Sequence, residues 1–391
     1  MNFAEHAIMW QVYPLGAVGA PIRPDEHEAE ASLEHRLNSL EGWLDYVVEL
    51  GCNALLLGPV FKSLSHGYDT VDFFSIDPRL GTEEDMDALL LAARERGIGV
   101  LFDGVFNHVA AQSRYNELTT GDSFEGHDIL AELDHNNPAV ADLVADVMNY
   151  WLDKGIAGWR LDAVYAIDPD FWARVLPRVK DKHPDAWIVG EMIHGDYADY
   201  VARSGINSVT EYELWKAIWS SLKEGNFFEL EWTLGRHNEF LEHFVPQTFI
   251  GNHDVTRIAS QIGQEKAVLA AAILFTVGGV PSIYYGDEQG FTGIKEENIA
   301  GDDAIRPPLP EEFSPLGTWI ENIYKALISL RRQHPWLYEA RTEIVDISNE
   351  QLTYIARGNS GSSEEITVQL DLEQVSVRIF AGEEELFSYV S

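Results

Sequence analysis

Cysteine is almost absent from this chain of 391 residues, because Cys52 is the only one and no internal disulfide can form. It lies in an apolar, strand-like stretch, which favours a small buried residue over a nucleophile. The N-terminal residues lack the basic start and apolar run of a secretion signal. The longest uncharged stretch, 267–286, is interrupted by Gly278, Gly279 and Pro281, which predicts a buried helix and a strand rather than a membrane span. We therefore expect a soluble, cytoplasmic protein.

Positive charge is also scarce, with 27 Lys and Arg against 64 Asp and Glu and a formal net charge of −37. Nucleic-acid binding and attachment to an anionic membrane both require a basic surface, so we expect neither partner. Solubility explains the acidity most simply, and adaptation to high salt is the alternative. Apolar residues make up 46% of the chain, which excludes disorder and allows one large core with a small appendage.

Short apolar segments alternate with longer amphipathic ones along most of the chain. Several of the short segments, such as 54–57, are apolar on both faces, as strands of a buried parallel sheet are. The predicted strands are 8–13, 54–57, 99–103, 158–162, 187–191, 207–211, 248–250 and 282–285, with helices such as 40–50, 83–96, 139–153 and 171–180 between them. Eight such repeats predict an α/β fold, a (β/α)₈ TIM barrel. A doubly wound sheet is the alternative, but it would not need eight units.

Two segments depart from this rhythm. Residues 107–136 follow the third strand and are polar, irregular and long for a connecting loop, so we expect a short excursion over the active face. After a helix ending near Arg332, the segments 345–355, 365–370, 375–380 and 385–390 read as strands of a small C-terminal β-domain. The predicted organisation is a barrel of residues 1–106 and 137–335, the excursion 107–136, and a β-domain of residues 336–391.

Polar residues crowd the C-terminal ends of four predicted strands, where such barrels place their active sites. A single polar strand end could be a solvated cap, but four at one rim are hard to explain by structure alone, because buried carboxylates are costly unless paired or used. The four segments are Asp103-Gly-Val-Phe-Asn107-His108, Gly158-Trp-Arg160-Leu-Asp162, Val189-Gly-Glu191 and Ile250-Gly-Asn-His253-Asp254.

The spacing of these residues suggests two different carboxylates. Arg160 and Asp162 are two apart on one strand and point to the same side, so the guanidinium can keep Asp162 ionised as a nucleophile. Glu191 ends the next strand and is followed by the apolar Met192 and Ile193, which would raise its pKa and keep it protonated as a general acid. Such a pair suits retaining glycoside hydrolysis, which requires the two carboxyl groups about 5 Å apart.

These four segments resemble, in order, the hallmark regions of the α-amylase superfamily, and 51–59 and 279–288 resemble its second- and eighth-strand motifs. The resemblance spans about residues 8–335 and implies Asp162 as nucleophile, Glu191 as acid/base and Asp254 as the third carboxylate, which binds sugar hydroxyls. It also implies a substrate-binding role for other residues of these motifs: Asp103, His108, Arg160 and His253 around the reacting glucose, and His66 and Tyr68, with Tyr68 stacked under the ring.

Some details are similar to the neopullulanase, cyclomaltodextrinase and maltogenic amylase branch of that family. The segment 190–194 resembles its Gly-Glu-x-x-His, which adds His194, and 133–138 resembles its Leu-Asn-x-x-Asn-Pro with Asp134 in place of asparagine. Asp302 and Arg306 resemble a pair that holds the non-reducing end of short substrates. A solvated salt bridge in a loop is the alternative for this pair.

Other details depart from that branch. Its separate N-terminal domain is not expected here, since the first strand begins near Ile8. The Lys-His pair that follows the nucleophile in calcium-dependent α-amylases is replaced by Tyr165-Ala166. Asn107 could still bind calcium, but one candidate ligand does not make a site of six to eight, so we expect no metal or other cofactor. Ala163 is a small residue commoner in members that act on α-1,4 bonds.

The leading hypothesis is a retaining hydrolase of α-1,4-glucosidic bonds in maltooligosaccharides or cyclodextrins, with a small oligosaccharide as its partner. A transglycosylase or isomerase, such as a trehalose synthase or a glucosyltransferase, would use the same glycosyl-enzyme and is the second hypothesis. A non-catalytic carbohydrate-binding protein is the third, and the complete set of three carboxylates argues against it. The oligomeric state stays open.

Overall fold

The computed structural model describes residues 3–24, 33–298, 300–358 and 363–391. Its central feature is an eight-stranded parallel sheet in the order β11-β10-β9-β5-β2-β1-β13-β12. A bridge between Thr210 and Gln247 joins the two ends, which closes the sheet into a barrel. The strands are β1 Met9–Val12, β2 Ala54–Leu57, β5 Gly99–Gly104, β9 Gly158–Leu161, β10 Trp187–Gly190, β11 Ser208–Val209, β12 Gln247–Phe249 and β13 Val280–Tyr284. The prediction of a (β/α)₈ barrel is confirmed.

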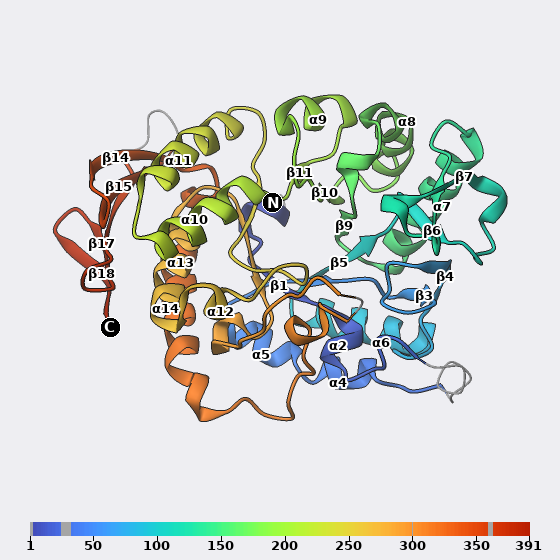
Figure 1. The fold of residues 1–391 in the computed structure, drawn as a ribbon, viewed down its shortest axis with the longest axis horizontal. Helices are drawn as coiled ribbons and strands as arrows, with labels where there is room; N and C mark the ends of the chain where they lie inside the picture. Colours follow the sequence, from blue (N-terminus) through green and yellow to red (C-terminus); the bar gives the residue numbers. More distant parts are fainter. Residues whose placement is uncertain (1–2, 25–32, 299, 359–362) are drawn as a thin grey trace.

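Helices surround this barrel (Figure 1). Their ends follow local signals: Thr82 and Asp85 form a capping box before α6, and Asn137 caps α7. The predicted helix 40–50 is instead two helices, separated by a turn at Gly42 and Trp43. The helices are α1 Phe3–His6, α2 Pro14–Ala17, α4 Leu37–Glu41, α5 Leu44–Leu50, α6 Glu83–Glu95, α7 Pro138–Lys154, α8 Pro169–Lys180, α9 Tyr197–Ser204, α10 Tyr212–Glu224, α11 Phe228–Phe240, α12 Ile258–Ile262, α13 Gln264–Thr276 and α14 Thr318–Gln333.

The barrel strands are apolar on both faces because side chains fill the barrel inside and helices cover it outside. Packing inside is tight enough that a Cβ at Gly158 would lie 1.9 Å from the carbonyl oxygen of Trp187, so only glycine can occupy that position. The uncharged stretch 267–286 forms most of the buried helix α13 and then β13, as predicted. None of the helices in the described ranges is both long and apolar enough to cross a bilayer.

Two small sheets rise from the barrel (Figure 1). After β2, the hairpin of β3 Phe61–Ser63 and β4 Thr70–Ile76 was not predicted. After β5, the excursion predicted as irregular contains an antiparallel sheet of β6 His108–Ala110, β7 Thr119–Ser123 and β8 Leu130–Leu133. Both stand at the C-terminal ends of barrel strands, above the predicted site.

The C-terminal part forms a five-stranded antiparallel sheet of β14 Arg341–Ile347, β15 Gln351–Arg357, β16 Glu365–Asp371, β17 Ser376–Ala381 and β18 Glu384–Val390. The single strand predicted for 345–355 is wrong, because the chain reverses between β14 and β15, where the Ser348 hydroxyl accepts a hydrogen bond from the Gln351 amide. The sheet contacts α11, α13 and α14 (Figure 1). The predicted domain boundaries stay predictions.

Short 3₁₀ helices complete the described chain. They are η1 Asn116–Leu118, η2 Phe124–Gly126, η3 Val164–Ala166, η4 Asp287–Gln289, η5 Asp303–Ile305, η6 Pro315–Gly317 and η7 Pro335–Glu339. Several occupy the loops that follow barrel strands. These loops therefore have a defined backbone around the predicted site.

Candidate active site

Asp162 and Glu191 follow directly after two neighbouring barrel strands. Leu161 of β9 pairs with Gly190 of β10, so the next residue on each strand is one of the two carboxylates. The backbone continues this register, since the Glu191 amide donates to the Leu161 carbonyl at 2.8 Å. Parallel strands end at the same rim, which places both side chains at the C-terminal face of the barrel.

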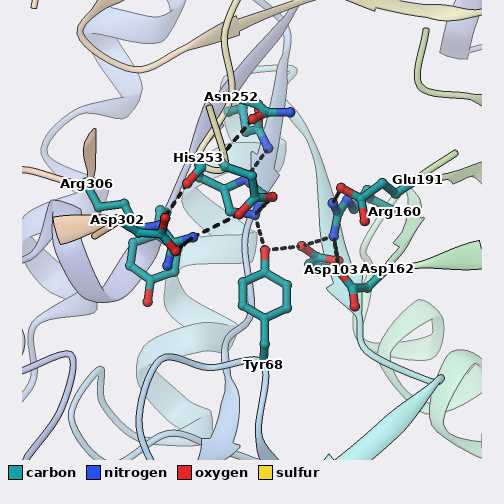
Figure 2. Close-up of polar contacts among 12 residues, drawn as sticks. Tyr68, Asp103, Arg160, Asp162, Glu191, Asn252, His253, Asp302 and Arg306 are labelled. Atoms are coloured by element: carbon teal, nitrogen blue, oxygen red, sulfur yellow. Dashed lines mark hydrogen bonds and ion pairs between the residues drawn. The ribbon is translucent and has the colours of Figure 1, made fainter. Parts of the chain in front are cut away.

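Arg160 lies at the centre of the acidic residues (Figure 2). Its Nη1 donates to both carboxylate oxygens of Asp103 at 2.8 Å and to Asp162 Oδ1 at 2.9 Å. Its Nη2 forms an ion pair with Glu191 Oε1 at 2.6 Å. The side chains of all four residues are nearly or fully buried, so one guanidinium serves three carboxylates.

Burial has a larger effect on the pKa of Asp162 than this shared cation does. Burial raises the pKa of Asp162 to about 7 and that of Asp103 to about 6, and the attraction of Arg160 only partly opposes the rise. Arg160 favours the ionised form of Asp162, as expected, but does not offset the whole effect of burial. Since one positive charge cannot balance three buried negative ones, the cluster favours keeping at least one proton.

Burial acts on Glu191 in the same direction as on Asp162 and Asp103, while its hydrogen-bond donors favour the ionised form. Burial raises its pKa, against the opposing charge of Arg160. Its Oε1 accepts a hydrogen bond from the Tyr212 hydroxyl at 3.1 Å, and its Oε2 accepts one from the Ala163 amide at 3.1 Å. The predicted direction of the shift is confirmed, but Ile193 is 43% exposed and does not contribute to the apolar setting. The structure adds Tyr212 to the site. In the sequence, Tyr212 directly follows the strand predicted at 207–211, and this position at a strand end could have suggested it.

Asp254 stands apart from this cluster and is half-buried. It lies 2.9 Å from Arg306 Nη2 and 3.0 Å from His253 Nε2. Burial alone would raise the pKa of Asp254, but His253 and Arg306 outweigh it and hold the pKa well below its usual range. Asp254 is therefore the permanently ionised member of the three.

Arg306 is buried and links several parts of the site (Figure 2). Besides Asp254, its Nη2 contacts Asp302 Oδ2 at 3.0 Å, and its Nε donates to the His253 carbonyl. Arg306 is therefore not solvated, whereas Asp302 remains partly exposed. The pair lies beside Asp254, where it can meet the same ligand.

Tyr68 lies between the cluster around Arg160 and the His253–Asp254 pair (Figure 2). The β3–β4 connection carries it there, and its hydroxyl contacts Asp103 Oδ2 at 3.0 Å and also His253 Nε2. The His108 imidazole lies 3.0 Å from the Tyr68 carbonyl, and burial lowers the pKa of His108 to about 4, so it is neutral. His66 is two residues from Tyr68, and its backbone carbonyl accepts a hydrogen bond from Tyr13.

Sequence reasoning missed three residues that hold His253 and its neighbours. Gln11 Nε2 lies 3.1 Å from His253 Nδ1, and the Tyr13 ring lies 4.5 Å from the Arg306 guanidinium carbon. Asn252 accepts from the Asp254 amide and donates to the Tyr212 hydroxyl, which connects Asp254 to Glu191. Predicted His194, by contrast, is exposed and packs on the Tyr165 ring at 5.0 Å.

Comparison with known proteins decides the family. The model of the family described as "Alpha amylase, catalytic domain" matches residues 36–128 and 124–312, more than half of the chain. The chain belongs to the α-amylase family. Neopullulanase 2 from Thermoactinomyces vulgaris is 30% identical over 384 residues, which are 85% of this chain and 63% of that protein. A cyclomaltodextrinase from a Bacillus species is 30% identical over 289 residues, 64% of this chain and 51% of that one. The chain thus spans less than two thirds of the length of these two relatives.

Solved structures agree on the fold of this α-amylase family member. The cyclic α-maltosyl-(1→6)-maltose hydrolase from Arthrobacter globiformis, in its ligand-free form, matches with a TM-score of 0.81 and 26% identity. That match covers 95% of this chain and 92% of that chain. The acarbose-soaked debranching enzyme from Nostoc punctiforme, at 24% identity and a TM-score of 0.79, shows the fold alone. The family predicted from the motifs is confirmed.

Asn107 was the one calcium ligand that the sequence suggested. Within the described part of the chain, no three or more His, Cys, Asp or Glu side chains are grouped so that they could hold a metal ion. The side-chain amide of Asn107, the one candidate ligand, contacts His108 at 3.3 Å.

Proposed function

We propose that this protein hydrolyses α-glucosidic bonds of maltooligosaccharides or cyclodextrins with retention at the anomeric carbon. The observation that carries the proposal is the pair Asp162 and Glu191, which end adjacent strands and face the same guanidinium of Arg160. Both carboxylates are ion-paired to Arg160, but Glu191 also accepts hydrogen bonds from the Tyr212 hydroxyl and the Ala163 amide. Different environments for two carboxylates are typical of glycosidases.

In the proposed mechanism, ionised Asp162 attacks the anomeric carbon while protonated Glu191 transfers its proton to the leaving glucosidic oxygen. The carbon–oxygen bond of the substrate breaks, and a glycosyl ester forms on Asp162. Glu191, now a carboxylate, removes a proton from water, whose oxygen attacks the same carbon and breaks the ester. Both residues then return to their starting forms. Arg160 and Asp254 offset and orient charge around the sugar throughout.

The names of the relatives support short α-glucans as substrates. Asp302 and Arg306 lie beside Asp254, where they would limit the space for a long chain. Ala163, which predicts α-1,4 specificity, has φ 47° and directs its amide to Glu191. A cytoplasmic location is also proposed, supported by a relative named intracellular maltogenic amylase from Bacillus subtilis at 28% identity.

The decisive experiment compares Asp162→Asn and Glu191→Gln with the wild type on maltotriose, β-cyclodextrin, pullulan and cyclic maltosyl-maltose. Each variant is expected to lose at least a thousandfold in kcat, because a missing nucleophile or acid cannot be replaced by its neighbours. Asp77→Asn is the matched control, since Asp77 is equally buried and ion-paired to Arg79 at 2.7 Å but lies outside the cluster.

Product analysis tests the stereochemistry and the transfer alternative. Nuclear magnetic resonance should detect the α-anomer as the first product, and trehalose or lengthened chains from maltose would instead indicate a transglycosylase or isomerase. Equal rates in Asp162→Asn and in the wild type would contradict the proposal.

A further inference from the structure

A cavity of about 670 Å³ opens in the outer wall of the barrel, away from the three carboxylates. It lies between α4, α5 and the loop before α14, and its wall includes Trp43, Tyr46 and Phe313. A volume of several hundred cubic ångströms is that of a pocket for a small ligand. No residue assigned above to catalysis or substrate binding lines it.

These three aromatic rings form one side of the cavity wall. The Phe313 ring lies 4.6 Å from Trp43 and 5.0 Å from Tyr46 between ring centroids, and both contacts are tilted. All three side chains are only half-buried, so part of each ring remains available at the cavity surface. Such ring faces bind the apolar CH face of a sugar well, because the ligand gains contact area with little loss of side-chain freedom.

The rim of the cavity offers hydrogen-bond acceptors. Glu311 and Glu312 are exposed and have no ion-pair partner within the described ranges, and no Lys or Arg lines the cavity. Glu321 is already held by Lys325 at 2.6 Å. Exposed carboxylates bind a cation weakly because water and salt screen the charge. A neutral ligand with many hydroxyl donors above a ring platform suits this wall better than a cation.

The cavity shares a wall with the active site. The Leu309 amide, at the cavity, donates to the Ala17 carbonyl at 2.8 Å, and a Cβ on Gly16 would lie 2.3 Å from the Arg306 carbonyl oxygen. The same two segments carry Tyr13 and Arg306; the Arg306 guanidinium packs on the Tyr13 ring and is ion-paired to Asp254. A saccharide in the cavity would therefore lie directly behind the proposed sugar-binding end of the catalytic site.

We propose that this cavity is a second, non-catalytic binding site for a short neutral α-glucan, with Trp43 and Phe313 as its platform. The choice of glucan rests on the proposed function, while the saccharide chemistry rests on the rings and acceptors of the cavity.

The test uses Asp162→Asn protein, so that glucan is not consumed, with maltotriose as the probe. Hydrogen–deuterium exchange should show slower exchange in residues 37–50 and 307–321 when maltotriose is added. Titration calorimetry should resolve two sites. Phe313→Ala, combined with Glu311→Gln and Glu312→Gln, should weaken one of them at least tenfold and abolish the added protection. Phe313→Leu keeps the packing but removes the ring, and it should also lose the second site.

The matched control is Trp232→Ala, because Trp232 is 63% exposed on α11 and packs only on Arg236 among the described rings and cations. It should leave both sites unchanged. Unchanged binding in both Phe313 variants, or protection of the cavity by choline but not by maltotriose, would overturn the inference. A wild-type protein that cleaves no glucan but still binds maltotriose here would contradict the proposed function and leave this second site standing.

Discussion

Replacing Arg257 with lysine should reduce catalysis from a position that touches no substrate. Arg257 is fully buried, and its Nη1 donates to the Tyr285 carbonyl at 2.8 Å and to Asp287 Oδ1 at 2.9 Å. Its Nη2 donates to the Ile305 carbonyl at 3.0 Å, directly before Arg306. This one guanidinium therefore positions the loop whose Arg306 holds Asp254.

The expected loss of stability in Arg257→Lys follows from the hydrogen bonds that lysine cannot replace. Its single ammonium cannot reach Asp287 and Ile305 together, so at least one charge-assisted hydrogen bond, about 1.5–3 kcal/mol, is lost. The ammonium can still face Asp287, so the expected fall in unfolding free energy is about 1.5–3 kcal/mol. If Arg306 shifts by a few tenths of an ångström to 1 Å, kcat/KM should fall about tenfold to a hundredfold.

Arg331→Lys is the matched control. Arg331 is also buried, and it donates to the carbonyls of Phe275, Val277 and Gly279 at the opposite end of the barrel, far from Arg306. Urea unfolding followed by tryptophan fluorescence should show both variants destabilised. Kinetics on maltotriose, measured at urea concentrations well below the unfolding midpoints of both variants, should show reduced kcat/KM in Arg257→Lys alone. Equal losses in the two variants, or none in Arg257→Lys, would refute the positioning role.

Two further predictions concern pH. Because burial raises the pKa of Asp162 to about 7, kcat/KM should fall as the pH drops below about 7, where the nucleophile becomes protonated; an unchanged rate down to pH 5 would contradict this. Burial also raises the pKa of Glu288 to about 7, so its contribution to stability is present at low pH and is lost as the pH rises through 7. Urea unfolding can measure how far the free energy of unfolding falls between pH 5 and pH 8. This fall should be smaller in Glu288→Gln than in the wild type, by up to roughly 3 kcal/mol. An equal fall in both proteins would show that Glu288 does not titrate in this range.

The barrel and the rim that carries Asp162, Glu191 and Asp254 could be predicted from the chain alone. Apolar periodicity marks buried parallel strands wherever they lie, and the residue after each strand must reach the same edge of the closed sheet. No contact has to be known for that inference. The strand 345–355 shows its limit, because a run rich in β-forming residues does not reveal the reversal after β14.

Only the tertiary structure decided the electrostatics and the partners of these carboxylates. Arg160 is two residues from Asp162, but its contacts with Asp103 and Glu191 arise because β5, β9 and β10 lie side by side. Gln11 and Tyr13 reach His253 and Arg306 across more than two hundred residues of sequence, since barrel closure places β1 between β2 and β13. Burial, which raises the pKa of Asp162, is a property of everything packed around it. Local sequence therefore determines which groups stand at the rim, and three-dimensional packing determines their charge.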